Sequence, residues 1–167
     1  SNIQLTIDLE YQSILEEELK KRQEETNSSS ATGIIMDPET GEVLAMATTP
    51  GFDNNHFGST RPEFHRIKSI TDQFEPGSTF KVVSTVSALY NGLISLNDEF
   101  NCENGSFEYH TKKVTDHESY SMLTASQIIH HSSNIGIIKI MDQVGQKKLF
   151  SMSRDFGFGS KTGINLS

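Results

Sequence analysis

A serine and a lysine three positions apart, Ser78 and Lys81, have the types and spacing that best fit a chemical role. They follow the turn residues Pro76 and Gly77 and open a mostly apolar segment. The apolar positions recur with helical spacing and Gly92 ends the run, so we expect a largely buried helix with Ser78 in its first turn. Residues three apart share a face of a helix, so both side chains should point the same way.

This pair could form an activated serine nucleophile. A serine hydroxyl attacks poorly until a neighbouring base takes its proton. Lys81 could be that base, because an apolar site and the positive end of a helix both disfavour its ammonium form. The S-x-x-K arrangement occurs in active-site serine acyltransferases. The alternative is a helix-capping serine followed by a solvated lysine.

A second polar cluster, Ser132-Ser133-Asn134, forms an S-x-N tripeptide. A hydroxyl and an amide two positions apart in an irregular turn can point into one cleft. There Ser132 could relay protons and Asn134 could hydrogen-bond a peptide group of a substrate. The alternative is a connecting loop that is rich in Ser and Asn for conformational reasons. In combination with the S-x-x-K helix, the cluster favours the catalytic interpretation.

Further short segments match a known family in order and spacing along almost the whole chain. Besides the two motifs, they are Leu5–Asp8, Met36–Ala47, Pro50–Asp53, Thr71–Phe74, Leu123–Thr124 and Phe156–Gly159. With these segments the chain resembles the transpeptidase domain of the penicillin-binding proteins, class B in particular. The resemblance implies a mixed α/β (α+β) fold of the penicillin-binding protein/β-lactamase-like type, with helices on an antiparallel sheet.

The resemblance implies a peptidoglycan D,D-transpeptidase that cross-links cell-wall stem peptides. Ser78 would attack the carbonyl between the two terminal D-alanines, and Lys81 would take its proton. Ser132 would relay a proton to the leaving D-alanine, and Asn134 would hold the substrate backbone. A neighbouring stem-peptide amine would then resolve the acyl-enzyme. β-Lactam antibiotics such as the penicillins would leave a stable ester on Ser78, and no cofactor is implied.

Three other functions remain open on the same motifs. A receptor domain that senses β-lactams would use the serine and lysine for binding only. A serine β-lactamase would add a deacylating group, although Asn134 in the S-x-N tripeptide favours the penicillin-binding proteins. A non-catalytic cell-wall scaffold would need neither activity.

The resemblance also implies that residues 1–167 are the N-terminal portion of the domain, without the later sheet strands and the third motif, Lys-Thr/Ser-Gly. The triplet Lys161-Thr162-Gly163 has that composition. It follows two glycines and a serine, which do not favour a strand, so we expect a family loop instead. With one convincing hairpin, 32–36 with 42–48, we expect open sheet edges, self-association and poor activity of the chain alone.

The other elements follow from periodicity and from capping residues. We expect a helix capped by Asp8 to about Gln23, an irregular stretch over 50–73, a polar loop over 93–118, a helix capped by Thr124, and helices over 135–144 and 146–156.

Charge and composition exclude several partners. The net charge of −8 without a basic patch argues against nucleic acid. Cys102 is the single cysteine, so no intrachain disulfide can form. The six histidines show no zinc spacing, so no metal site is expected. The sequence contains no membrane-spanning run; family members are usually anchored by an upstream helix, which implies action on the extracytoplasmic face of the bacterial membrane.

Overall fold

The computed structural model describes residues 4–164 and 166, and the chain divides into two compact units, with the boundary in the sequence between Phe74 and Glu75. Helices and antiparallel strands occur in both, which confirms the mixed α/β class. The four candidate site residues all lie in the second unit. Within the described residues, no helix combines the length and apolar character needed to cross a bilayer.

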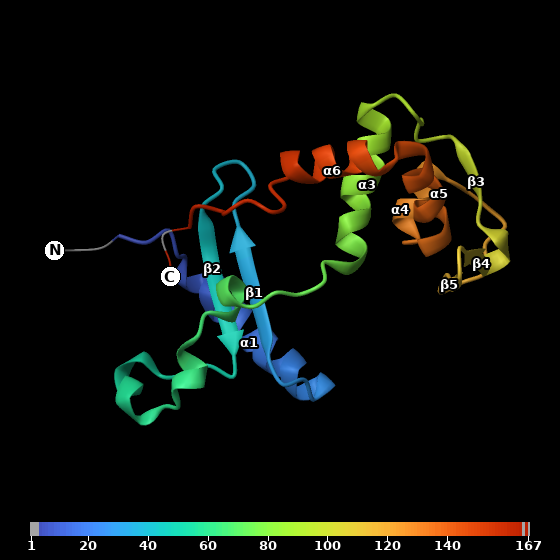
Figure 1. Ribbon diagram of the computed structural model, residues 1–167. Helices are drawn as coiled ribbons and strands as arrows, with labels where there is room; N and C mark the ends of the chain where they lie inside the picture. The colour runs from blue at the N-terminus through green and yellow to red at the C-terminus, as the bar shows by residue number, and fades with distance from the viewer. Residues whose placement is uncertain (1–3, 165, 167) are drawn as a thin grey trace. The chain divides into compact units, whose positions relative to one another are not determined.

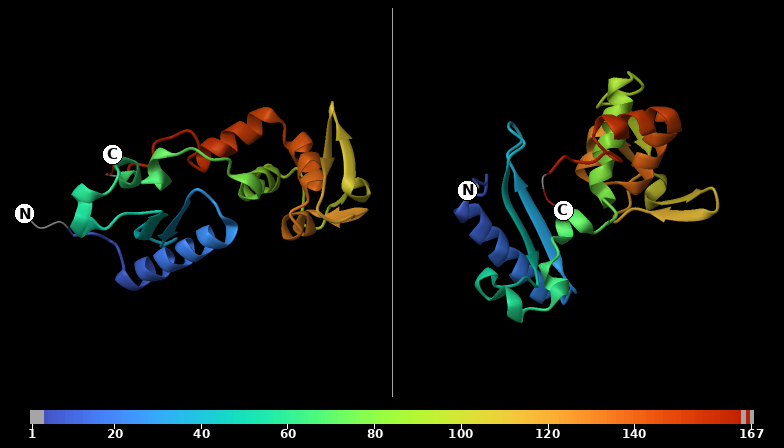
Figure 2. Two further views of the ribbon diagram at one scale, coloured as in Figure 1. Left: turned by 90° about the horizontal axis from the view of Figure 1, so that it is seen from below. Right: turned by 60° about the vertical axis from the view of Figure 1, so that its left-hand side comes forward.

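In the first unit, helix α1 (Leu9–Thr26) runs along one face of the hairpin of β1 (Ala31–Met36) and β2 (Val43–Thr49), as Figures 1 and 2 show. The Asp8 carboxylate accepts the Glu10 and Tyr11 N–H groups, which confirms the expected helix start. Gln12 fastens α1 to the hairpin, since its amide donates to the Met46 carbonyl and accepts the Met46 N–H.

The stretch after this hairpin is irregular, as expected. It contains two 3-10 helices, η1 (Asn54–Ser59) and η2 (Pro62–His65), and one short α-helix, α2 (Lys68–Thr71).

In the second unit, a 3-10 turn, η3 (Gly77–Thr79), leads directly into helix α3 (Phe80–Tyr90). Ser78 therefore lies in the turn ahead of α3, and the expectation of an α-helical first turn at Ser78 is wrong by two residues. Gly77 has a φ of +60°, a backbone conformation that glycine adopts without steric cost. Helices α4 (Ala125–His130), α5 (Asn134–Val144) and α6 (Gln146–Asp155) follow in the expected places.

The expected polar loop over 93–118 is wrong, because this part of the chain forms strands. β3 (Glu99–Asn101) pairs antiparallel with β6 (Met122–Thr124), and β4 (Ser106–Tyr109) pairs antiparallel with β5 (Lys112–Thr115). The physical reason is alternation: Phe100 is buried between two exposed polar neighbours, and Phe107 and Val114 turn inward on β4 and β5. The count of one hairpin is therefore also wrong, although every described sheet has two strands.

The core of the second unit lies among α3, α4, α5 and β3. Its buried members are Ala88, Ile94, Phe100, Cys102, Leu123, Ala125, Ile128, Ile137, Ile140 and Val144. A fully buried isoleucine contributes about 1.5–3 kcal/mol relative to an exposed one. A Cβ added at Gly136 would lie 2.5 Å from Ile128 Cγ1, so α5 can approach α4 this closely only with glycine there. This packing fixes the turn between α4 and α5, where the S-x-N tripeptide lies.

Candidate active site

The Lys81 ammonium group joins the two sequence motifs in space. Its Nζ donates to the Ser132 carbonyl oxygen (2.5 Å), to Ser132 Oγ (2.9 Å) and to Asn134 Oδ1 (2.8 Å). An ammonium group has three N–H donors, and each has an acceptor here. The structure therefore brings together Lys81, Ser132 and Asn134.

Ser78 lies three residues before Lys81, in the η3 turn, and its side chain is exposed. Thr79 Oγ1 donates to the Pro76 carbonyl at 2.6 Å, which fixes the turn. Among these candidate residues, the structure shows no hydrogen bond between Ser78 and the other three. A catalytic contact of this kind is often long before substrate binds.

Burial changes the acidity of the lysine. Removal of Lys81 from water is the main cause that lowers its pKa from the ordinary value of 10.5, because burial penalises the charged form. The negative charge of Asp116 opposes this and raises the pKa. Desolvation is the larger cause, so the ammonium group gives up its proton more readily than a solvated lysine.

The S-x-N turn connects α4 to α5, with Ser132 in the left-handed region at a φ of +55°. Non-glycine residues seldom adopt this conformation, and it persists where surrounding contacts hold it. The N–H groups of Ser132 and Ser133 donate to the carbonyls of Ile129 and Ile128 at the end of α4. The turn is thus tied to the helix before it.

Two residues that sequence reasoning missed also hold this turn. The Thr115 carbonyl accepts a bond from Asn134 Nδ2 at 2.9 Å, and the Asp116 carboxylate accepts bonds from the backbone at the start of α5. Recognition of β5 as a strand would have been the signal, because it places Thr115 and Asp116 at a strand end. No local spacing links them to Ser132.

The triplet Lys161–Gly163 lies outside any strand and is exposed. The segment before it forms a turn in which the Phe158 ring meets the Phe80 ring edge to face, with centroids 5.2 Å apart. This geometry supports the interpretation of the triplet as a loop.

No group of three or more His, Cys, Asp or Glu side chains in the described part of the chain is arranged to hold a metal ion.

Comparison with known proteins matches the chain to one family of domains. The family model for the penicillin binding protein transpeptidase domain matches residues 31–167. The chain is 33% identical over 165 residues to the peptidoglycan D,D-transpeptidase FtsI of Escherichia coli K12, covering 99% of this chain and 28% of that protein. It is 30% identical over 168 residues to the stage V sporulation protein D of Bacillus subtilis, covering 99% and 26%. The chain thus spans about a quarter of the length of these relatives.

Solved structures show the same fold. The apo transpeptidase domain of Burkholderia pseudomallei penicillin-binding protein 3 superposes with a TM-score of 0.84 at 28% identity, covering 98% of this chain and 45% of that chain. Penicillin-binding protein 3 of Mycobacterium tuberculosis gives a TM-score of 0.84 at 26% identity, covering 96% and 36%. The predicted penicillin-binding protein/β-lactamase-like fold is confirmed.

Proposed function

The chain belongs to the penicillin-binding protein transpeptidase family, and we propose that it carries the first part of the active site of a peptidoglycan D,D-transpeptidase. The single observation that supports this most is the contact of Lys81 with Ser132 and Asn134 one helical turn after Ser78. Two motifs more than 50 residues apart in sequence meet at one ammonium group. A capping serine with a solvated lysine would not produce this convergence.

In the proposed reaction, Ser78 is the nucleophile and Lys81 is the general base. The Ser78 oxygen attacks the carbonyl between the terminal D-alanines of a stem peptide while Lys81, in its neutral form, takes the hydroxyl proton. Ser78 lies in the η3 turn that leads into α3, where the first N–H groups of a helical segment lack intrahelical partners, and we expect its N–H to bind the oxygen on which negative charge develops.

Ser132 is suited to pass the proton to the leaving group. Of the three acceptors around Lys81 Nζ, only Ser132 Oγ also carries a proton. When Lys81 is neutral, this one bond can reverse direction, with Ser132 donating to the nitrogen lone pair. Ser132 can therefore exchange a proton with Lys81 and deliver one to the departing D-alanine amine.

In the proposed site, Asn134 binds the substrate backbone. Its Oδ1 faces Lys81 and its Nδ2 donates to Thr115, so both ends of the amide are fixed in orientation. An amide NH₂ has two donors, and the second remains for a substrate carbonyl. β-Lactams would enter the same site as substrate analogues, and the parent protein would act on the extracytoplasmic face of the bacterial membrane.

The function is tested in the full-length domain, meaning this chain continued to the length of the solved transpeptidase domains. With a stem peptide ending in D-Ala-D-Ala and an acceptor amine, we expect release of D-alanine and formation of a cross-linked product. Mass spectrometry detects both. Penicillin should form a long-lived acyl-enzyme. Rapid penicillin hydrolysis would instead indicate a β-lactamase, a stable adduct without transpeptidation would indicate a receptor, and neither reaction would indicate a scaffold.

Lys161 provides a separate prediction, that it lies outside the catalytic machinery. In the full-length domain, Lys161→Ala should leave the rate of penicillin acylation within about 3-fold of wild type, because an exposed loop substitution removes no contact of Lys81. Stopped-flow measurement with a fluorescent penicillin checks this. A collapse of the rate in a protein with an unchanged circular dichroism spectrum would make Lys161 part of the site.

A further inference from the structure

Asp116 lies directly after β5, and its carboxylate meets the start of helix α5. Oδ1 accepts the Asn134 N–H at 2.5 Å and the Ile135 N–H at 3.1 Å, while Oδ2 accepts the Ser133 hydroxyl at 2.6 Å. The first N–H groups of a helix otherwise lack partners, and a carboxylate there is favoured by the helix dipole. One side chain that follows β5 thus binds both Ser133 and Asn134 of the tripeptide.

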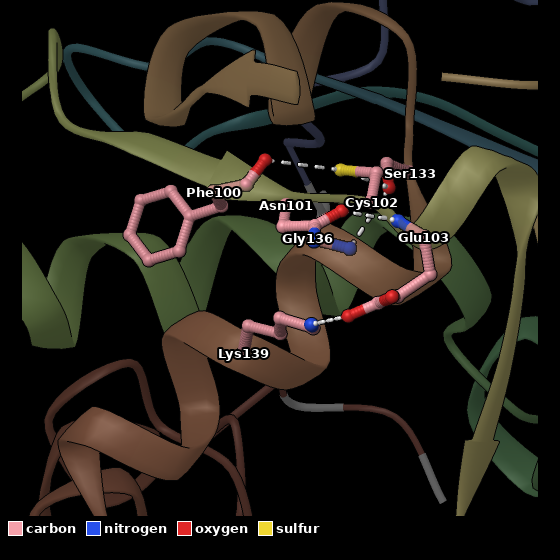
Figure 3. Close-up of polar contacts among 7 residues, drawn as sticks. All are labelled: Phe100, Asn101, Cys102, Glu103, Ser133, Gly136 and Lys139. Carbon is pink, nitrogen blue, oxygen red and sulfur yellow. Dashed lines mark hydrogen bonds and ion pairs between the residues drawn. The ribbon is translucent and has the colours of Figure 1, made fainter. Parts of the chain in front are cut away.

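Ser133 extends this anchor into α5. The residue is 1% exposed, and its hydroxyl oxygen accepts the Gly136 N–H at 2.9 Å, a contact drawn in Figure 3. The hydroxyl proton goes to Asp116 at 2.6 Å, since the other neighbour, Cys102 Sγ, lies 3.7 Å away. The middle residue of the S-x-N tripeptide therefore links Asp116 to the helix and faces away from the reacting groups.

The turn needs such an anchor. Ser132 is held at a φ of +55°, a conformation that costs a non-glycine residue free energy. The α4 carbonyls hold the turn on one side, and Asp116 holds it on the other. Without Asp116, the backbone at Asn134 and Ile135 would lose its partner, and the turn could relax away from Lys81.

We propose that Asp116 is a positioning residue. Through its bonds to the start of α5, it keeps Ser132 and Asn134 within hydrogen-bond distance of Lys81. This inference rests on the proposed function, because the positions of Ser132 and Asn134 relative to Lys81 matter for acylation only if Lys81 and Ser132 act on Ser78. What Asp116 supplies is correctly placed acceptor oxygen rather than net charge. That distinction can be measured with two conservative variants.

Asp116→Asn keeps the length of the side chain and an oxygen that can accept both N–H groups, while its NH₂ can donate to Ser133 Oγ. Asp116→Glu keeps the charge but is one methylene longer, so its oxygens cannot occupy the same positions. In the full-length domain we expect penicillin acylation within about 10-fold of wild type for Asp116→Asn. For Asp116→Glu and Asp116→Ala we expect a loss of about 10²-fold, the size expected for a misplacement near 1 Å.

The control is Glu103→Gln. Glu103 forms an ion pair with Lys139, which lies on α5; Lys139 Nζ is 2.5 Å from Glu103 Oε1, as Figure 3 shows, and the substitution removes the negative charge. It loosens α5 at a point away from the tripeptide, so acylation should stay within about 3-fold of wild type. A loss in this variant as large as in Asp116→Glu would mean that any loosening of α5 is enough, and would overturn the specific role of Asp116.

Amide hydrogen exchange at Asn134 and Ile135 reports on the anchor whether or not the protein reacts with penicillin. We expect exchange about 10-fold faster or more in Asp116→Glu and near wild type in Asp116→Asn. If the wild-type protein does not react with penicillin, only the proposed function is overturned. The hydrogen-exchange rates of the variants would still show whether Asp116 holds the start of α5. An Asp116→Glu variant that acylates or protects these amides as well as Asp116→Asn would overturn the inference, even if Asp116→Ala fails to fold.

Discussion

Ser78→Ala in the full-length domain should abolish covalent labelling by penicillin. The acyl group needs an oxygen nucleophile, and the substitution removes the hydroxyl that lies three residues before Lys81 in the turn ahead of α3. Neighbouring hydroxyls have other partners: Thr79 Oγ1 donates to the Pro76 carbonyl, Ser132 Oγ is hydrogen-bonded to Lys81 Nζ, and Ser133 Oγ donates to Asp116. Intact-protein mass spectrometry should show the mass of one penicillin added to wild type and none added to the variant.

Peptide mapping of the wild-type adduct supplies the second half of this test. The modified peptide should contain Ser78. Ser126→Ala, which alters an exposed serine on α4 in the same unit, should label like wild type and serves as the matched control. An adduct on Ser132 or Ser133, or full labelling of Ser78→Ala, would show that the nucleophile has been misassigned.

Helix boundaries could be predicted from the sequence because their signals are local. Asp8 accepts N–H groups two and three residues ahead, and Thr124 forms a capping box with Gln127. Each of these bonds joins residues that are neighbours in the sequence, so the residue types alone indicate them. The start of α3 was the exception, because a 3-10 turn takes the place of its first residues.

The strands over 99–124 could not be predicted in the same way. β3 and β6 have three residues each, and their pairing joins positions more than 20 residues apart, from Glu99 with Thr124 to Asn101 with Met122. One buried aromatic residue between two polar neighbours is too short a pattern to separate a strand from a loop. The partner strand and the core beneath Phe100 decide the outcome, and both are tertiary features.

The candidate site shows the same division. The three-residue spacing of Ser78 and Lys81 could be recognised from the motif itself. The contact of Lys81 with Ser132 and Asn134 was expected only because the chain resembles a known family. Asp116 had neither a local spacing nor a named motif. Its role depends on the end of β5 lying beside the start of α5, and that arrangement required the structure.

Lys81 substitutions should slow acylation of Ser78 in the full-length domain by about 10²–10⁴-fold, the usual contribution of a general base. Lys81→Met removes the base and keeps much of the side-chain volume. Lys81→Arg keeps a cation that can still donate to the Ser132 carbonyl and to Asn134, but a guanidinium does not lose its proton in the working pH range. Both should therefore be slow, and the time course with a fluorescent penicillin gives each rate. Recovery by Lys81→Arg to within about 10-fold of wild type would show that the charge, and not the base, is what the site needs.

The pH dependence of acylation provides an independent check on the same role. The active form has neutral Lys81, so the rate should rise with pH as the ammonium group loses its proton and should level off above the pKa in the folded protein. Burial lowers that pKa from 10.5, so the rise should lie at lower pH than for a solvated lysine. The negative charge of Asp116 acts in the opposite direction and limits the shift. Measurement of the acylation rate constant across the pH range should show this rise for wild type and no such rise for Lys81→Met. If the rate falls as pH rises through this range, or if the rise persists in Lys81→Met, the base is another group.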